Sequence, residues 1–293
     1  MRPSTGPGVR RVRLLISLLA LAVVLVAALA VRYQWSWAAP LSRRWQRWHP
    51  WIGAYVRCAP GTFTYLFILV ITTWVLRSST FDIRHALLSE HSTNLTQLRH
   101  DPVSVMVTSA FWVTSPELAL WIVLFPLVLA PAERWLGTLR TIVVFFIGHV
   151  GATLVTAAGL AVMINHHFLP QHLRDVVDVG SSYGFWCVAG LFAYRLPGRW
   201  REAWALTLVV GAVALMALRE GFSDFGHFTA IVIGLCLYGM SLAPAVRNRD
   251  HWPIWRPPEV IVAAERERID AHERLVRGDD GPVTRRGRRP PAP

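Results

Sequence analysis

Long hydrophobic blocks recur along the chain and constrain its fold more than any other feature. They cover residues 14–31, 61–76, 118–132, 141–164, 203–218 and 225–245. Of the 293 residues, 53% are hydrophobic, which is too apolar for a soluble domain of this length. The sequence therefore predicts a polytopic membrane protein.

All 30 basic residues are arginines, and the net charge is +12. They cluster beside the hydrophobic blocks, a pattern that favours loops and tails next to anionic lipid over nucleic-acid binding. The basic turns at 134–140 and 195–201 and the tail after 247 are expected on the cytoplasmic side. We therefore expect a multi-pass protein of the cell membrane whose partner is the lipid bilayer and whose C-terminus is cytoplasmic. No sequence feature fixes an oligomeric state.

The chain divides into three parts. Residues 1–60 hold a hydrophobic helix and a connector rich in Trp and Arg, which is expected to lie along the membrane interface. Residues 61–245 form the main membrane domain. Residues 246–293 form a basic tail that is expected to be helical over 258–277 and disordered after it. The block at 14–31 resembles a signal sequence but is long enough to span, and a retained helix of open orientation is favoured.

A serine and a histidine open two of the late hydrophobic segments, which we expect at 179–194 and 225–245. Because a single segment lies between these two, they run in the same direction, and Ser182 and His227 lie about one helical turn inside the same membrane face. Several late segments have only about 16 apolar residues, or about 24 Å of helix, so water comes close to their ends. A serine and a histidine at equal depth suggest a nucleophile and its base.

Small residues accompany both side chains. Gly180 and Gly184 lie four apart around Ser182, and Gly226, Ala230 and Gly234 form a similar stripe beside His227. Facing stripes of small residues let two helices approach closely, as a Ser–His hydrogen bond requires. In the alternative interpretation the stripes serve packing alone, Ser182 bonds to its own helix, and His227 is a lone polar core residue.

With these residues in place, the sequence resembles the rhomboid intramembrane serine proteases, and more closely the actinobacterial rhomboid-like branch. The family has a G-x-S-G signature on one helix and a histidine on its last helix. The matching positions are Gly180, Ser182, Trp186, Gly190, His227, Ala230 and Gly234, together with Glu133 and Gly137 of an L-E-x-x-x-G turn. The resemblance covers about residues 61–245.

The resemblance implies an all-α fold, a rhomboid-like six-helix core with one extra N-terminal transmembrane helix. It also implies that Ser182 is the nucleophile and His227 the general base of a catalytic dyad, with Trp186 packed against the imidazole. Such a protease would cleave transmembrane substrates near the outer membrane face through an acyl-enzyme, without a cofactor.

Three positions depart from the pattern of active rhomboids. The His and Asn that help bind the oxyanion are replaced by Glu117 and Trp121, and the glycine after the nucleophile is Tyr183. An ionised carboxylate donates no hydrogen bond, an indole offers only its N–H, and loss of one oxyanion donor costs roughly 10²–10³ in rate. A second hypothesis is therefore a catalytically inactive rhomboid-like protein that binds transmembrane segments.

Two further groups of residues could form a metal site or a proton path. His166, His167, His172 and Asp175 lie in one polar loop, but their spacing fits no metal motif, and we expect no metal site. Glu117 and His149 would suit the proton path of a transporter, although no inverted repeat supports transport. The three cysteines, at 58, 187 and 236, show no motif spacing.

Overall fold

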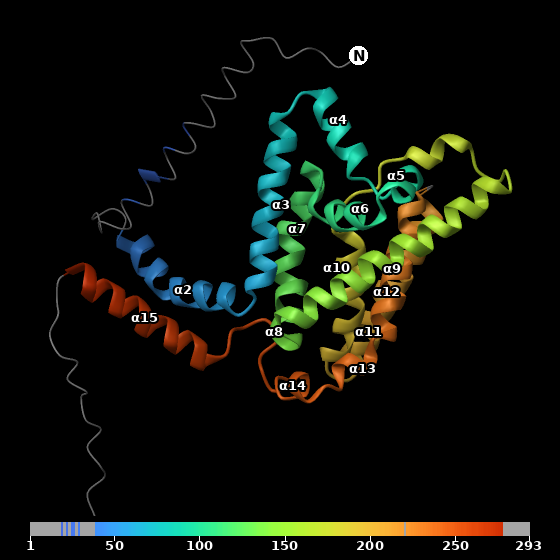
Figure 1. Ribbon diagram of the computed structural model, residues 1–293. Helices are drawn as coiled ribbons and strands as arrows, with labels where there is room; N and C mark the ends of the chain where they lie inside the picture. Colours follow the sequence, from blue (N-terminus) through green and yellow to red (C-terminus); the bar gives the residue numbers. More distant parts are fainter. Residues whose placement is uncertain are drawn as a thin grey trace, which may run out of the picture. The chain divides into compact units, whose positions relative to one another are not determined.

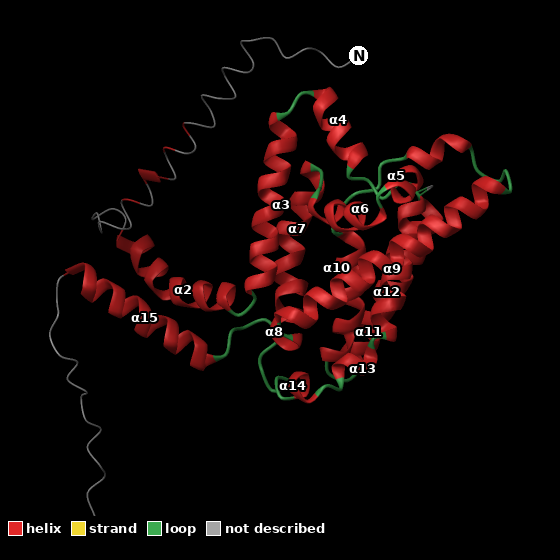
Figure 2. Ribbon diagram, viewed as in Figure 1, coloured by secondary structure: helices red, strands yellow, loops and turns green. Residues whose placement is uncertain are grey.

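The computed structural model describes residues 39–219 and 221–277, together with the isolated positions 19, 22, 25, 26 and 29. Within this part of the chain every regular element is a helix (Figures 1 and 2). The hydrophobic block expected at 14–31 lies outside the described residues, apart from the isolated positions, and so does the end of the tail from 278 onward.

The chain separates into two compact units, residues 1–55 with 257–293 and residues 56–256. The smaller unit contains most of α2 (Ala39–Arg57) and all of α15 (Glu259–Arg277), and α15 confirms the helix expected at 258–277. The two helices meet closely, because a Cβ added to Gly53 would lie 2.8 Å from Oε1 of Glu265. On α2, Trp45 and Trp48 remain exposed, as expected of a helix at a membrane interface.

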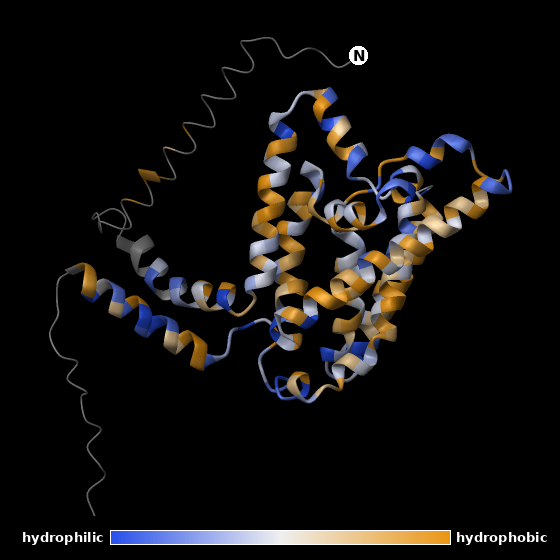
Figure 3. Cartoon of the chain, viewed as in Figure 1, coloured by the Kyte–Doolittle hydropathy of each residue, from blue (hydrophilic) through white to orange (hydrophobic). Residues whose placement is uncertain are grey.

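Four helices of the larger unit are long and apolar enough to cross a membrane, by length and composition. They are α3 (Pro60–Ser78), the continuous helix Ser115–Leu136, α9 (Thr138–Asn165) and α11 (Arg199–Leu218). They confirm the blocks expected at 61–76, 118–132, 141–164 and 203–218. Hydrophobic residues predominate along α3 and α9 (Figure 3), and many lie exposed where lipid would cover them.

The helix Ser115–Leu136 has three consecutive parts, α7 (Ser115–Leu124), a π-helical turn (Phe125–Leu129) and α8 (Ala130–Leu136). Pro126 lies in the π-helical turn and has no backbone N–H to donate to the carbonyl four residues earlier. A missing hydrogen bond of this kind is a common cause of an irregular helical turn.

Two shorter helices complete the six expected between 61 and 245. They are α10 (Ser182–Phe192) and α12 (Phe222–Cys236). Both are shorter than predicted: α10 begins at Ser182, because Gly180 has a φ of 133° that no helix continues through, and α12 ends at Cys236. Nearly all of α10 is buried, and it packs against both α9 and α12 (Figure 1).

The connections between these helices carry short helical pieces. They are α4 (Phe81–Glu90), α5 (Leu95–His100), α6 (Pro102–Thr108), a 3₁₀ turn (Ser109–Phe111), a second (Gln171–Asp175), a third (Ala193–Arg195), α13 (Tyr238–Ser241) and α14 (Pro244–Arg247). The segment at 77–101 is thus ordered.

The basic turn expected at 134–140 is shorter than predicted and is confined to Gly137. The helix continues to Leu136, Gly137 adopts a φ of 89°, and α9 begins at Thr138. Glu133 is 2% exposed, and its carboxylate accepts hydrogen bonds from Gly61 N at 2.8 Å and Thr62 N at 2.7 Å. It therefore binds N–H groups at the start of α3 that have no partner within their own helix.

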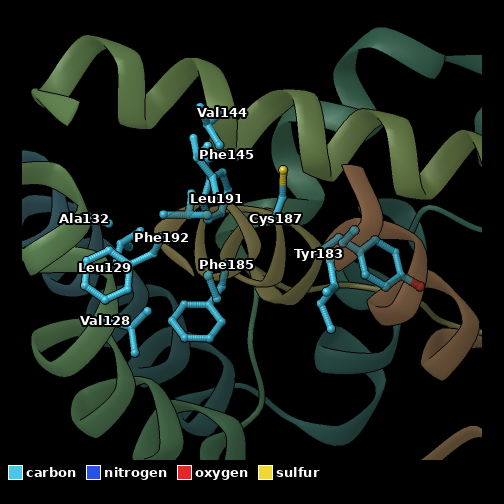
Figure 4. Packing of buried hydrophobic residues seen from close by; sticks show 14 of the residues in the cluster. Val128, Leu129, Ala132, Val144, Phe145, Tyr183, Phe185, Cys187, Leu191 and Phe192 are labelled. Carbon is cyan, nitrogen blue, oxygen red and sulfur yellow. The ribbon is translucent and has the colours of Figure 1, made fainter. Parts of the chain in front are cut away.

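The core of the larger unit forms around α10. Val144 and Phe145 from α9 meet Cys187 and Leu191 from α10 in a buried cluster (Figure 4). A Cβ on Gly148 would lie 2.0 Å from the Cys187 Cβ, so this glycine lets α9 and α10 approach closely. The tight packing fixes the position of α10, whose first residue is Ser182.

Candidate functional site

Ser182 is the first residue of α10 and is half-buried. Its hydroxyl makes no hydrogen bond to another group in the described part of the chain. The neighbouring Ser181 is fully buried. Of the two serines, Ser182 is therefore the one whose side chain is partly accessible.

His227 lies in the second turn of α12, and its side chain is 23% exposed. Its ring packs between two aromatic side chains of α10: the centroid distance is 5.4 Å to Tyr183 and 6.3 Å to Trp186. Its Nδ1 lies 3.5 Å from Oδ1 of Asp224, three residues earlier on the same helix.

Ser182 and His227 lie at the same end of the bundle, which we call the rim: the end at which α10 and α12 begin. Ser182 precedes Trp186 by four residues, so the two share one face of α10, and Trp186 contacts the imidazole. Ser182 and His227 are both among the described residues, and no hydrogen bond joins their side chains. Hydrogen bonds between catalytic groups are often long without substrate and shorten in the complex.

A hydrogen-bonded cluster around Asp178 connects the elements that meet at the rim. The carboxylate accepts from the hydroxyls of Tyr183 at 3.0 Å, Ser223 at 3.2 Å and Thr93 at 3.3 Å. Burial raises the pKa of the Asp178 carboxyl, and these three hydrogen bonds oppose that rise. The cluster joins α10, α12 and the segment before α5.

Backbone hydrogen bonds fix the loop that carries Asp178. Its carbonyl accepts from Thr93 N at 2.8 Å, and its N–H donates to Ser92 Oγ at 2.8 Å. Gly180 N donates to Ser109 O at 3.0 Å. The start of α10 is thus attached to two segments that are distant in the sequence.

Small residues produce the close approach of α10 and α12, but not all as predicted. A Cβ on Gly234 would lie 2.0 Å from the Cys187 carbonyl oxygen, and one on Gly190 would lie 2.6 Å from the Ile231 carbonyl oxygen. Ala230 is fully buried. Gly184, however, faces the Phe145 ring of α9, and Gly180 precedes α10, so the expected stripe of Gly180 and Gly184 toward α12 is wrong.

The side chain of Tyr183 fits against a glycine of α12. A Cβ on Gly226 would lie 2.4 Å from the Tyr183 ring. The bulk that Tyr183 adds at the position after Ser182 is therefore directed into the space that Gly226 leaves.

The two positions of the expected oxyanion site differ from each other. Glu117 is exposed at the start of α7, where its carboxylate accepts from Thr114 N at 2.7 Å as a helix cap. Trp121 is 4% exposed, and its ring lies 5.1 Å from that of Phe185 on α10. Within the described residues the Trp121 indole N–H has no hydrogen-bond partner, so a buried donor does lie beside α10.

The residues of the two other sites considered, a metal site and a proton path, make contacts elsewhere in the fold. His149 is 2% exposed, and its Nε2 lies 3.1 Å from Ser109 Oγ, whereas Glu117 is an exposed helix cap that accepts from Thr114 N. Asp175 accepts from Thr96 Oγ1 at 2.5 Å. Within the described residues, no group of three or more His, Cys, Asp or Glu gathers as a metal site would require.

The contacts of Asp178 and Asp224 were not predicted from the sequence. Each offered a signal: Asp178 is a carboxylate directly before a hydrophobic segment, and Asp224 lies three residues before His227, on the same helix face. Their partners Thr93 and Ser223 carry no distinctive spacing and become evident only in the fold.

Among the described residues, four helices long and apolar enough to cross a membrane, together with the shorter α10 and α12, define a polytopic membrane protein of rhomboid-like architecture, with Ser182 and His227 at one rim. Residues 54–248 match the family described as rhomboid-like proteins, and the chain belongs to this family. No curated protein and no solved structure matches the chain.

Proposed function

We propose that the protein is an intramembrane serine protease with Ser182 as nucleophile and His227 as general base. The observation that carries the proposal is the position of the Ser182 hydroxyl. The hydroxyl makes no hydrogen bond to another described group. Ser182 lies on the same face of α10 as Trp186, four residues later, and Trp186 contacts His227. Rhomboid-like family membership supports this assignment.

The chemistry follows from these two side chains. Ser182 Oγ attacks the scissile carbonyl carbon as its proton passes to His227 Nε2. The C–N bond of the resulting oxyanion breaks, the leaving amine takes the proton from His227, and an ester on Ser182 remains. Water then attacks the ester carbon and gives its proton to His227, which returns it to Ser182 Oγ as the carboxylic acid leaves.

The developing oxyanion requires hydrogen-bond donors. The first N–H groups of α10 have no partner in their own helix, and they carry the partial positive charge of its N-terminus. The unpaired indole N–H of Trp121 is a further donor beside this helix. Glu117 is occupied as a cap, so it takes no part.

The substrates are single-pass transmembrane segments that reach the rim from the lipid. We place the protein in the cell membrane with the residues after 247 in the cytoplasm and the rim outside, because the arginine-rich turns favour that orientation. Cleavage then takes place near the outer face.

A fluorescent fluorophosphonate tests the proposal without a known substrate, because it reacts with activated serines. The wild-type protein in detergent is expected to become labelled, whereas Ser182→Ala and His227→Ala are not. Ser181→Ala is the matched control, since it removes the adjacent buried hydroxyl, and it should label as the wild type does.

A second candidate is a catalytically inactive protein that binds transmembrane segments. Tyr183 favours it, since this side chain takes the place of the family's glycine and joins the start of α10 to Asp178. The same experiment decides between them: a folded wild-type protein that does not react at Ser182 contradicts the protease and supports this candidate.

A further inference from the structure

Asp224 is buried without an obvious structural reason. It is 5% exposed in the first turn of α12, and the His227 imidazole is the only side-chain polar partner it has within the described residues. An acidic residue stabilises the start of a helix through the helix dipole, but an exposed carboxylate would do so without the cost of burial. A buried carboxylate needs a partner of its own, and here the partner is the proposed base.

We propose that Asp224 is a positioning residue, which holds His227 in the tautomer that carries its hydrogen on Nδ1 and leaves Nε2 as the base. The inference rests on the proposed function and adds a third member to a site that the family resemblance describes as a dyad. The geometry behind it is the 3.5 Å between Asp224 Oδ1 and His227 Nδ1.

The surroundings of the ring support one orientation. Tyr183 and Trp186 contact the ring from α10, so its rotation is restricted. When Nδ1 faces a carboxylate, hydrogen on Nδ1 is favoured, and the lone pair stays on Nε2, on the other side of the ring. A base that takes a proton from Ser182 must have this form.

The other charged groups near His227 do not compete for Nδ1. Asp178, in the loop before α10, already accepts from the hydroxyls of Tyr183, Ser223 and Thr93. Arg219, just before α12, is exposed. Among the described residues, Asp224 is the carboxylate within ion-pair distance of the imidazole.

The test combines two measurements on the full-length protein. ¹⁵N-histidine NMR, with the His227 signals assigned by their loss in His227→Ala, reports the tautomer directly. In the wild type we expect the Nδ1–H form, and in Asp224→Asn a shift toward the Nε2–H form. The rate of fluorophosphonate labelling should fall at least about tenfold in Asp224→Asn, because a wrong tautomer removes the base.

Two controls separate positioning from folding. Glu202→Gln makes the same change in the first turn of α11, where the carboxylate is exposed, and should alter neither readout. Asp224→Glu keeps the negative charge, and it should recover the wild-type tautomer and part of the labelling rate even if Asp224→Asn is poorly folded.

The results distinguish the two proposals. An unchanged His227 tautomer in Asp224→Asn, or labelling at the wild-type rate, overturns the role of Asp224. A wild-type protein that is not labelled, but whose His227 tautomer depends on Asp224, supports the positioning contact and contradicts the protease.

Discussion

The hydroxyl of Tyr183 lies 3.0 Å from Oδ2 of Asp178. This contact connects the residue after the proposed nucleophile to a carboxylate that also accepts from Ser223 on α12. A glycine at position 183 could not make it. The start of α10 is therefore held in place by a side chain at the position where the family pattern has a glycine.

Removal of that hydroxyl should destabilise the rim. Tyr183→Phe leaves the ring against Gly226 but removes one donor to the half-buried Asp178 carboxylate, which is expected to lower the free energy of unfolding by about 1 kcal/mol. The melting temperature in detergent measures the effect. Thr207→Val is a control, because the Thr207 hydroxyl only bonds to the Ala203 carbonyl of its own helix. A Tyr183→Phe protein as stable as the wild type would contradict the importance of the contact.

The pH dependence of stability should carry the signature of Asp178. Its pKa is raised by burial above the ordinary value of 3.8, so the folded protein binds this proton more tightly than the unfolded chain. The contribution of Asp178 is therefore fully present below pH 3.8 and is lost as the pH rises through the folded-state pKa. Melting temperatures across this acidic range should fall with rising pH more steeply in the wild type than in Asp178→Asn. Equal slopes would show that Asp178 does not bind the proton more tightly in the folded state.

Glu133 should be among the most sensitive positions outside the rim. In Glu133→Gln an amide NH₂ replaces an oxygen that faces the N–H groups of Gly61 and Thr62, which should cost about 1–3 kcal/mol of unfolding free energy. Glu117→Gln alters an exposed cap and should cost less than about 1 kcal/mol. If thermal denaturation gave both variants the same small shift, the buried role of Glu133 would be refuted.

Replacing a glycine by alanine should lower the stability of the protein at Gly234 in α12 and raise it at Gly211 in α11. In Gly234→Ala the new Cβ would lie 2.0 Å from the Cys187 carbonyl oxygen, and overpacking of this kind typically costs about 1–3 kcal/mol. Gly211 of α11 has no atom within 4 Å of an added Cβ, so Gly211→Ala should stabilise the helix by about 0.5–1 kcal/mol. Melting temperatures of the two variants provide the comparison, and a tolerated Gly234→Ala would argue against close packing of α10 and α12.

The positions of the long helices could be predicted from the sequence because hydrophobic length is a local property. The start of α10 could not, since it depends on Gly180 and on hydrogen bonds from this loop to Thr93 and Ser109, which are distant in the chain. Glu133 was expected in a turn, whereas the fold buries its carboxylate against hydrogen-bond donors of α3. Such donors leave no pattern in the sequence around the carboxylate.

The candidate site, like the fold, could be predicted only in part from the sequence. Ser182 and His227 could be proposed from their positions in the late hydrophobic segments, and Trp186 from the family resemblance. Small residues mark close packing, but they do not name the neighbouring helix, and Gly184 consequently packs on Phe145 of α9. The contact between Asp224 and His227 depends on the position of the ring between Tyr183 and Trp186, which only the packed helices determine.

The most direct test of the proposed function is to map the fluorophosphonate adduct by mass spectrometry. The peptide that contains both serines distinguishes the half-buried Ser182 from the fully buried Ser181. We predict an adduct on Ser182 alone, which disappears in His227→Ala. An adduct on Ser181, an adduct that persists without His227, or a folded wild-type protein with no adduct would each contradict the proposed catalytic pair.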